Sequence, residues 1–217
     1  ALHTPERYRD LLTSAKEAHM NMIRLWGGGK FEKDAFYEIC DELGLLIWHD
    51  FMFACAVYPT DADFLNEVTE EITHQIKRLQ SHPSLAMWCG DNEGMDNKNK
   101  RVVRRHPEYY HNEYKRIIDL KGDLVETLDP GRLYWPTSPC GGPGDYETNG
   151  WKDDSKGDMH LWDVSKFVRP LADYYKFKPH FMSEFGHSCF SGNLETLEQQ
   201  KENMREKGGY ENIQERI

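Results

Sequence analysis

Two glutamates in this sequence could act together as a catalytic pair. Glu93 follows the apolar run 85–88, and Glu184 follows the apolar run 180–183. Each run is too short for a helix and has the composition typical of a buried parallel strand. Chains that alternate strands and helices carry their chemistry at the carboxyl ends of the strands. We therefore expect Glu93 and Glu184 to face each other, although they are far apart in the sequence.

A pair of carboxyl groups is the minimum equipment for hydrolysing a glycosidic bond. One carboxyl group must be protonated so that it can release the leaving oxygen. The other must be ionised so that it can attack the sugar or activate a water molecule. The pair predicts a glycosidase that needs no metal and no organic cofactor, because side chains supply both functions.

The composition argues against several other classes of protein. The chain has 217 residues and a formal net charge of −10, and its one basic cluster, residues 101–105, is more typical of a solvated surface than of a nucleic-acid site. No apolar run reaches the length of a membrane span, and the first twenty residues lack the order of a signal peptide. We expect no contact with nucleic acid or membrane, and the sequence leaves the cell compartment open.

Two further motifs are weak signals. The triplet Gly27–Gly29 follows an apparent strand, but it lacks the spacing and the lysine of a phosphate-binding loop. The five cysteines have neither CxxC pairs nor metal-type spacing, so we interpret them as mostly buried thiols. A metallohydrolase that uses His49, Asp50 and His160 stays a minor alternative, because paired histidine spacing is missing.

The elements that must position the two glutamates alternate along the chain. Apolar periodicity predicts helices at 5–18, 32–43, 61–80, 108–128, 163–176 and 194–206. It predicts strands at 21–25, 45–48, 85–88, 132–135, 157–159 and 180–183. This order is typical of an α/β protein with a parallel sheet, and polar residues after each strand favour a TIM-type (β/α)8 barrel. Such a barrel needs eight strands, so we expect residues 1–217 to form one incomplete barrel domain that contains the second to seventh strands.

The strings NMIRLWGGG, FYEICDELGLLIWHDFMFACAVYP, HPSLAMWCGDNE, LYWPTSP, GDMHLWD and FMSEFG occur in this order. They resemble the catalytic barrel of the β-mannosidases of glycoside hydrolase family 2, over about residues 4–190. The resemblance implies that Glu93, preceded by Asn92, is the general acid/base and that Glu184 is the nucleophile. It also implies that the sugar site is lined by Arg24, Trp26, Asp50, Asn92, His160 and Trp162.

Residue type suggests a role for several of these side chains. Arg24 can hold Glu184 ionised, and Asn92 can bind the sugar 2-hydroxyl. Trp26 or Trp162 can stack on a pyranose face. For each tryptophan, core packing is the alternative, and for Arg24 the alternative is a structural ion pair.

The mechanism implied by the resemblance is double displacement by a retaining exo-glycosidase that acts on terminal β-linked mannose. β-Galactosidase, β-glucuronidase and exo-glucosaminidase activities stay open, as does a binding or structural barrel without turnover. Two departures from the family pattern stand out. Asp91 occupies a position where asparagine is more frequent, and the first and eighth strands and the flanking β-sandwich domains are missing. We therefore expect a fragment of a larger enzyme, weakly active or inactive without the remaining domains of its parent chain.

Overall fold

The fold alternates strands and helices, as the sequence predicts. The structure is a computed structural model, and it describes residues 3–56, 58–94, 108–145, 154–166 and 170–186. The described strands are β1 (Met22–Leu25), β2 (Leu46–Asp50), β3 (Leu85–Cys89), β4 (Leu133–Trp135), β5 (Asp158–Leu161) and β6 (Phe181–Phe185). The described helices are α1 (Pro5–Glu17), α2 (Asp34–Leu43), α3 (Ala62–Leu79), η2 (Tyr109–Tyr114), α5 (Lys115–Leu128), α6 (Asp163–Lys166) and η3 (Leu171–Lys176). The helix predicted at 194–206 lies outside the described residues.

Local capping signals set the helix ends. The Thr4 side chain accepts a hydrogen bond from the Arg7 backbone amide, and it caps α1 as the sequence predicts. Asp61 caps α3 in the same way, through the amide of Phe64. Gly44 ends α2 with a φ of 66°, a left-handed conformation that glycine adopts without strain. After Gly44 the chain enters β2 at Leu46.

All strand pairs are parallel, but they form two sheets. The first sheet has the order β1-β2-β3-β4, and the second pairs β5 with β6. After β4 the chain does not pair with β5 along its length. Instead, the Asp158 amide donates to the Cys140 carbonyl at 3.1 Å, within the segment that follows β4. The predicted α/β class with parallel strands is confirmed, whereas the described strands form only part of a sheet and the predicted barrel is not shown.

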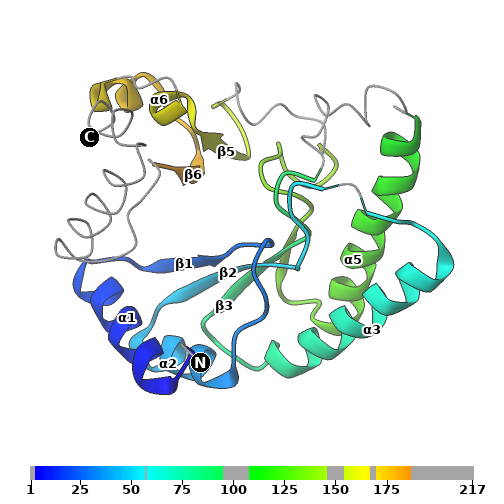
Figure 1. The fold of residues 1–217 in the computed structure, drawn as a ribbon, viewed down its shortest axis with the longest axis horizontal. Coiled ribbons are helices and arrows are strands. Elements are labelled where there is room, and N and C mark those ends of the chain that lie inside the picture. The colour runs from blue at the N-terminus through cyan, green and yellow to red at the C-terminus, as the bar shows by residue number, and fades with distance from the viewer. Residues whose placement is uncertain (1–2, 57, 95–107, 146–153, 167–169, 187–217) are drawn as a thin grey trace, which may run out of the picture.

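The main core lies between the four-stranded sheet and its helices. Trp88, Ile47 and Leu85 on the strands are almost fully buried with Tyr37 from α2 and Ile76 from α3. Helices α1, α2, α3 and α5 lie along the outer side of this sheet, and β5 and β6 lie across from its inner side (Figure 1). Among the described helices, none combines the length and the apolar character that crossing a bilayer requires.

Side chains connect the two sheets. The rings of Trp48 on β2 and Phe181 on β6 have centroids 5.3 Å apart. The Trp135 indole on β4 donates to the Asp158 carboxylate on β5 at 2.8 Å. These contacts join the amino ends of β5 and β6 to β4 and β2, and the ion pair of Glu184 with Arg24 joins β6 to β1 near the carboxyl end of β6.

Candidate active site

The loops after β2, β3 and β4 lie side by side. The Asn92 amide donates to the Phe53 carbonyl at 2.9 Å, and the Glu93 amide donates to the Ser138 carbonyl at 2.7 Å. Glu93 has a φ of 54°, which is uncommon for a residue other than glycine. Such strain is typical of functional sites and persists only where the surroundings enforce it. The backbone therefore fixes the direction in which the Glu93 side chain leaves the loop.

A buried ion pair lies beneath this loop. The Asp91 carboxylate accepts from the Gly94 amide at 3.0 Å and lies 3.6 Å from the Lys121 ammonium. Lys121 also donates to the Gly90 carbonyl at 2.6 Å. Burial lowers the pKa of Lys121, and the charge of Asp91 opposes that shift. Asp91 is fully buried and supports the turn that carries Glu93.

Glu184 lies on strand β6, opposite His160 in the register with β5. Its two carboxylate oxygens have different partners. The Arg24 guanidinium donates to one oxygen at 3.0 Å, and the Trp162 indole donates to the other at 3.1 Å. The two donors fix the direction of both carboxylate oxygens. This arrangement suits a carboxylate that must act as a nucleophile.

Arg24 on β1 is the centre of a charged network. Its guanidinium binds both oxygens of Asp50, at 3.3 and 2.8 Å, and it also donates to the Asn92 side chain at 2.9 Å. Burial alone would lower the pKa of Arg24, but the combined effect of its acidic neighbours, with Asp50 the largest, outweighs burial and the pKa is raised. Burial raises the pKa of Asp50, and Arg24 opposes that shift. The arginine stays charged and connects β1, β2, β3 and β6.

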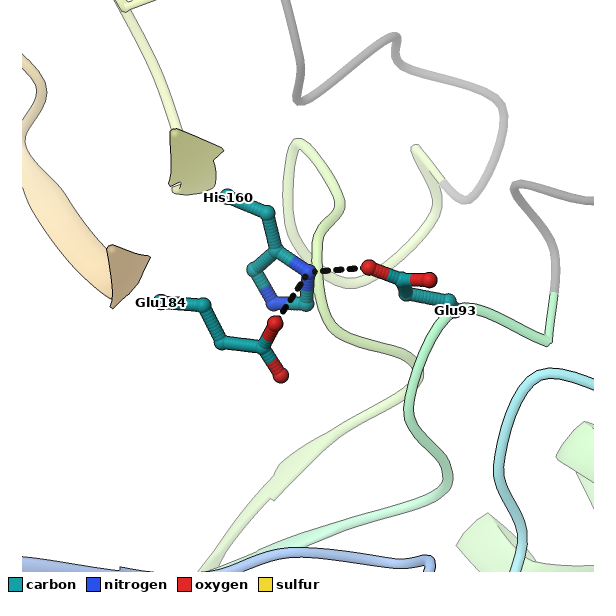
Figure 2. Close-up of side chains that lie close together, drawn as sticks. All are labelled: Glu93, His160 and Glu184. Carbon is teal, nitrogen blue, oxygen red and sulfur yellow. Dashed lines mark hydrogen bonds and ion pairs between the residues drawn. The ribbon is translucent and has the colours of Figure 1, made fainter. Parts of the chain in front are cut away.

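His160 lies between the two glutamates. Its Nδ1 atom is 2.9 Å from the Glu93 carboxylate and 3.4 Å from that of Glu184 (Figure 2). Ionised carboxylates only accept hydrogen bonds, so a proton on Nδ1 can connect both. The other ring nitrogen is 2.9 Å from the Ser138 hydroxyl. One imidazole thus holds the two side chains that the sequence pairs.

The same three residues have the spacing of a cation site. One ligand atom from each of Glu93, His160 and Glu184 lies within 4.8 Å of the others. The Arg24 guanidinium already contributes a positive charge to Glu184, which disfavours a divalent cation there. His49 lies elsewhere, because its ring nitrogens contact the Tyr37 hydroxyl and the Asp50 carbonyl. The arrangement fits a carboxylate pair better than a metal centre.

Most of the predicted site residues line one cavity of about 430 Å³, within the range of ligand pockets. Its wall is formed by Arg24, Trp26, Cys55, Asn92, Glu93, Trp162, Ser183 and Glu184. Trp26 is 49% exposed, so its face is accessible to a ligand. Asp50 and His160 were predicted to line the sugar site, but both are buried and lie behind this wall. They are placed to orient Arg24 and Glu93, and their contact with a sugar stays a prediction.

The sequence did not identify several supporting residues. Cys55 and Ser138 occur in the strings that carry the resemblance, yet their residue types gave no reason to assign them a role. The Cys55 thiol is 3.4 Å from Glu93, and Ser138 contacts His160. Trp48 donates to Asp50 at 2.9 Å, where the sequence indicated only a core strand. These contacts depend on how neighbouring strands and loops are placed relative to one another. The sequence of a single strand does not contain that information.

Known β-mannosidases are similar to this chain in sequence. The β-mannosidase of Capra hircus is 39% identical over 203 residues, and the match covers 90% of this chain and 23% of that protein. β-Mannosidase B of Aspergillus niger is 35% identical, and the match covers 94% of this chain and 25% of that protein. The chain therefore spans about a quarter of the length of these relatives. No protein-family model matches the sequence.

Solved structures show the same relationship. The crystal structure of the β-D-mannosidase from Dictyoglomus thermophilum is 39% identical, with a TM-score of 0.76, over 90% of this chain and 23% of that chain. β-Glucuronidase 2 of Bacteroides uniformis shares the fold, with a TM-score of 0.63 at 18% identity over 92% of this chain and 21% of that chain. The resemblance that the motifs predicted is thus confirmed: the chain is similar in sequence and fold to the β-mannosidases of glycoside hydrolase family 2, over about a quarter of their length.

Proposed function

We propose that this chain supplies the catalytic residues of a retaining β-mannosidase. The observation that carries the proposal is the convergence of Glu93 and Glu184 on one imidazole and one cavity. A carboxylate oxygen of each glutamate lies within 4.8 Å of the other. Retaining glycosidases hold their carboxyl groups about 5 to 5.5 Å apart, whereas inverting enzymes leave about 6.5 to 9.5 Å for a water molecule. The short separation supports double displacement.

Glu184 attacks the anomeric carbon in the first step, with its carboxylate held in place by Arg24 and Trp162. Glu93 donates its proton to the glycosidic oxygen as the bond to the leaving group breaks. A covalent mannosyl ester on Glu184 results. In the second step Glu93, now ionised, takes a proton from water, and the oxygen of that water displaces Glu184 from the anomeric carbon. Glu93 is protonated again, and the configuration at the anomeric carbon is retained.

The remaining wall residues bind the sugar. Trp26 offers an accessible aromatic face on which a pyranose ring can stack. Asn92 is fixed by Arg24 and can hydrogen-bond the sugar 2-hydroxyl. Its contact would strengthen as positive charge develops at the anomeric carbon, so it stabilises the transition state more than the ground state. The ligand is a glycoside or oligosaccharide with a terminal β-linked mannose.

The fold proposal is a (β/α)8 barrel, of which this chain provides the second to seventh strands. Two parallel sheets, of four and two described strands that mostly alternate with helices, support it, as does the likeness to a β-D-mannosidase structure. We propose that residues 1–217 are one part of the catalytic domain of a longer glycosidase, and that its remaining domains complete the barrel. The relevant protein for kinetics is the full-length natural protein that carries this sequence, called the full-length protein below.

A panel of aryl glycosides tests the proposed function. The full-length protein should hydrolyse aryl β-mannosides in preference to β-galactosides, β-glucuronides and β-glucosaminides. The Glu93→Gln and Glu184→Gln variants should lose turnover while still binding mannose-containing ligands. A preference for another sugar would assign a different activity in the same family. Unchanged turnover in both variants would refute the assignment of the two glutamates.

A further inference from the structure

Cys55 and Glu93 share an unusual backbone conformation. Cys55 has a φ of 51° and Glu93 has a φ of 54°, and neither is a glycine. Residues other than glycine are held in this region only where the surroundings enforce it, and they cluster at active sites. The Cys55 amide donates to the Asn92 carbonyl at 2.8 Å, so these two strained positions lie on adjoining loops. Both side chains line the same cavity.

The thiol of Cys55 has a defined direction. The Asn92 side-chain amide donates to the sulfur at 3.4 Å, and the sulfur donates to the second carboxylate oxygen of Glu93 at 3.4 Å. The first oxygen of Glu93 faces His160. Because Asn92 occupies the acceptor side of the sulfur, the S–H proton is available for Glu93. The contact therefore fixes which carboxylate oxygen faces which neighbour.

The other described cysteines have no comparable setting. Cys40, Cys89 and Cys140 are buried, whereas Cys55 is exposed. Burial raises the pKa of the Cys40 and Cys140 thiols to about 12, so they are inert at neutral pH. Cys55 alone among these four lines the candidate active site.

We propose that Cys55 is a positioning residue for the acid/base glutamate, which its thiol orients through the hydrogen bond to Glu93. This inference rests on the proposed function and deepens it. A donor that faces one oxygen stabilises the ionised form of Glu93, which exists after the proton has been given to the leaving group. The other oxygen stays directed toward His160 and the cavity. A weak S–H donor should contribute about three- to tenfold to the rate.

Leaving-group dependence in the full-length protein tests this role. Cys55→Ala should lower kcat/KM about three- to tenfold for an aryl mannoside with a poor leaving group, which needs the acid, and leave it nearly unchanged for the dinitrophenyl mannoside. The alkaline limb of the pH profile should move upward, because the ionised form of Glu93 loses a donor. Cys55→Ser, which keeps a donor, should restore both properties. Equal losses with both substrates, or a serine variant as impaired as the alanine variant, would overturn the proposal.

Alkylation of Cys55 tests the contact without relying on turnover. The full-length protein is treated with iodoacetamide, and the peptide that contains Cys55 is followed by mass spectrometry. A neighbouring carboxylate disfavours the thiolate, so Glu93→Gln should increase the alkylation rate of Cys55 severalfold. Glu126→Gln is the control, since Glu126 lines a different cavity. An unchanged alkylation rate in Glu93→Gln would refute the contact. An increased rate in Glu93→Gln, together with a wild-type protein that lacks mannosidase activity, would refute only the proposed function.

Discussion

Glu93 and Glu184 are held by different means. Glu184 lies on a strand, and its side chain receives hydrogen bonds from the Arg24 guanidinium and the Trp162 indole. Glu93 lies on a strained turn, and its side chain contacts the imidazole of His160 and the thiol of Cys55, among other groups. Charge fixes one carboxylate, whereas backbone geometry directs the other. A nucleophile must stay ionised, but an acid/base must exist in both protonation states, so this difference matches the proposed roles.

Alanine variants should separate the two roles most strongly. Glu184→Ala should lower kcat by more than about 10⁴-fold for every leaving group, because the covalent step is lost. Glu93→Ala should cost about 10²- to 10⁴-fold with poor leaving groups and much less with dinitrophenyl mannoside. Steady-state kinetics on the full-length protein measures both. Azide should accelerate turnover by the Glu93→Ala variant, because it replaces the water molecule that needs a general base. If the two variants depended on the leaving group in the same way, the assignment of different roles to Glu93 and Glu184 would be contradicted.

Arg24→Met should destabilise the region around Glu184, because it removes the positive charge that pairs with Asp50 and Glu184. Asp50 would remain buried without its guanidinium, a loss of about 3–5 kcal/mol of local stability. Hydrogen exchange of β1 and β2 in the full-length protein measures this loss. The double variant Arg24→Met with Asp50→Asn should recover part of it, because no isolated charge remains buried. Protection equal to that of the wild type would show that the network contributes little.

His49 should make the stability of strand β2 depend on pH in the acidic range. Burial lowers the pKa of His49 to about 4, from an ordinary value of about 6.5. Its ring is therefore neutral when folded and takes up a proton on unfolding, so stability falls as pH decreases from about 6.5 to about 4, by about 3 kcal/mol in total. The opening free energy of β2, measured by hydrogen exchange with correction for intrinsic rates, should follow this trend.

His49→Phe is the matched variant for the pH experiment. It removes the titrating group, so the opening free energy of β2 should depend less on pH between 6.5 and 4. The contribution of ordinary carboxyl groups remains. A wild-type profile parallel to that of the variant between pH 6.5 and 4 would show that His49 does not titrate as described.

Trp162→Phe should have the smallest effect of the set. It removes the indole N–H that faces Glu184 and keeps an aromatic ring in the cavity. A hydrogen bond to a charged group contributes about 1.5–3 kcal/mol, so kcat should fall about 10- to 100-fold for good and poor leaving groups alike. A loss confined to poor leaving groups would connect Trp162 to Glu93 instead.

Sequence patterns predicted the individual helices and strands better than the way in which the strands join into a barrel. Apolar runs and caps placed each described strand within about two residues, because burial and local hydrogen bonds act over a few positions. The barrel was inferred from strand order, but pairing between β4 and β5 depends on the path of the intervening segment 136–157. Part of that segment, 146–153, lies outside the described residues.

The site could be predicted as far as residue type and strand ends allow. Glu93 and Glu184 were identifiable because charged groups at the ends of parallel strands converge, whereas Arg24 was implied by the resemblance to the family. Asp50 and His160 were grouped with the cavity wall, since sequence alone does not distinguish a residue that faces the ligand from one behind it. Cys55 escaped notice because its contact with Glu93 requires two adjoining loops in a particular conformation.

Covalent trapping most directly tests the claim that Glu184 is the nucleophile and Glu93 its acid/base. The full-length protein would be incubated with a 2-deoxy-2-fluoro mannosyl fluoride, digested, and analysed by mass spectrometry. We expect one added fluoromannosyl group, on Glu184, in the wild type and none in Glu184→Gln. A label on Glu93, or steady turnover of mannosides with β-to-α inversion and no trapped ester, would contradict the account.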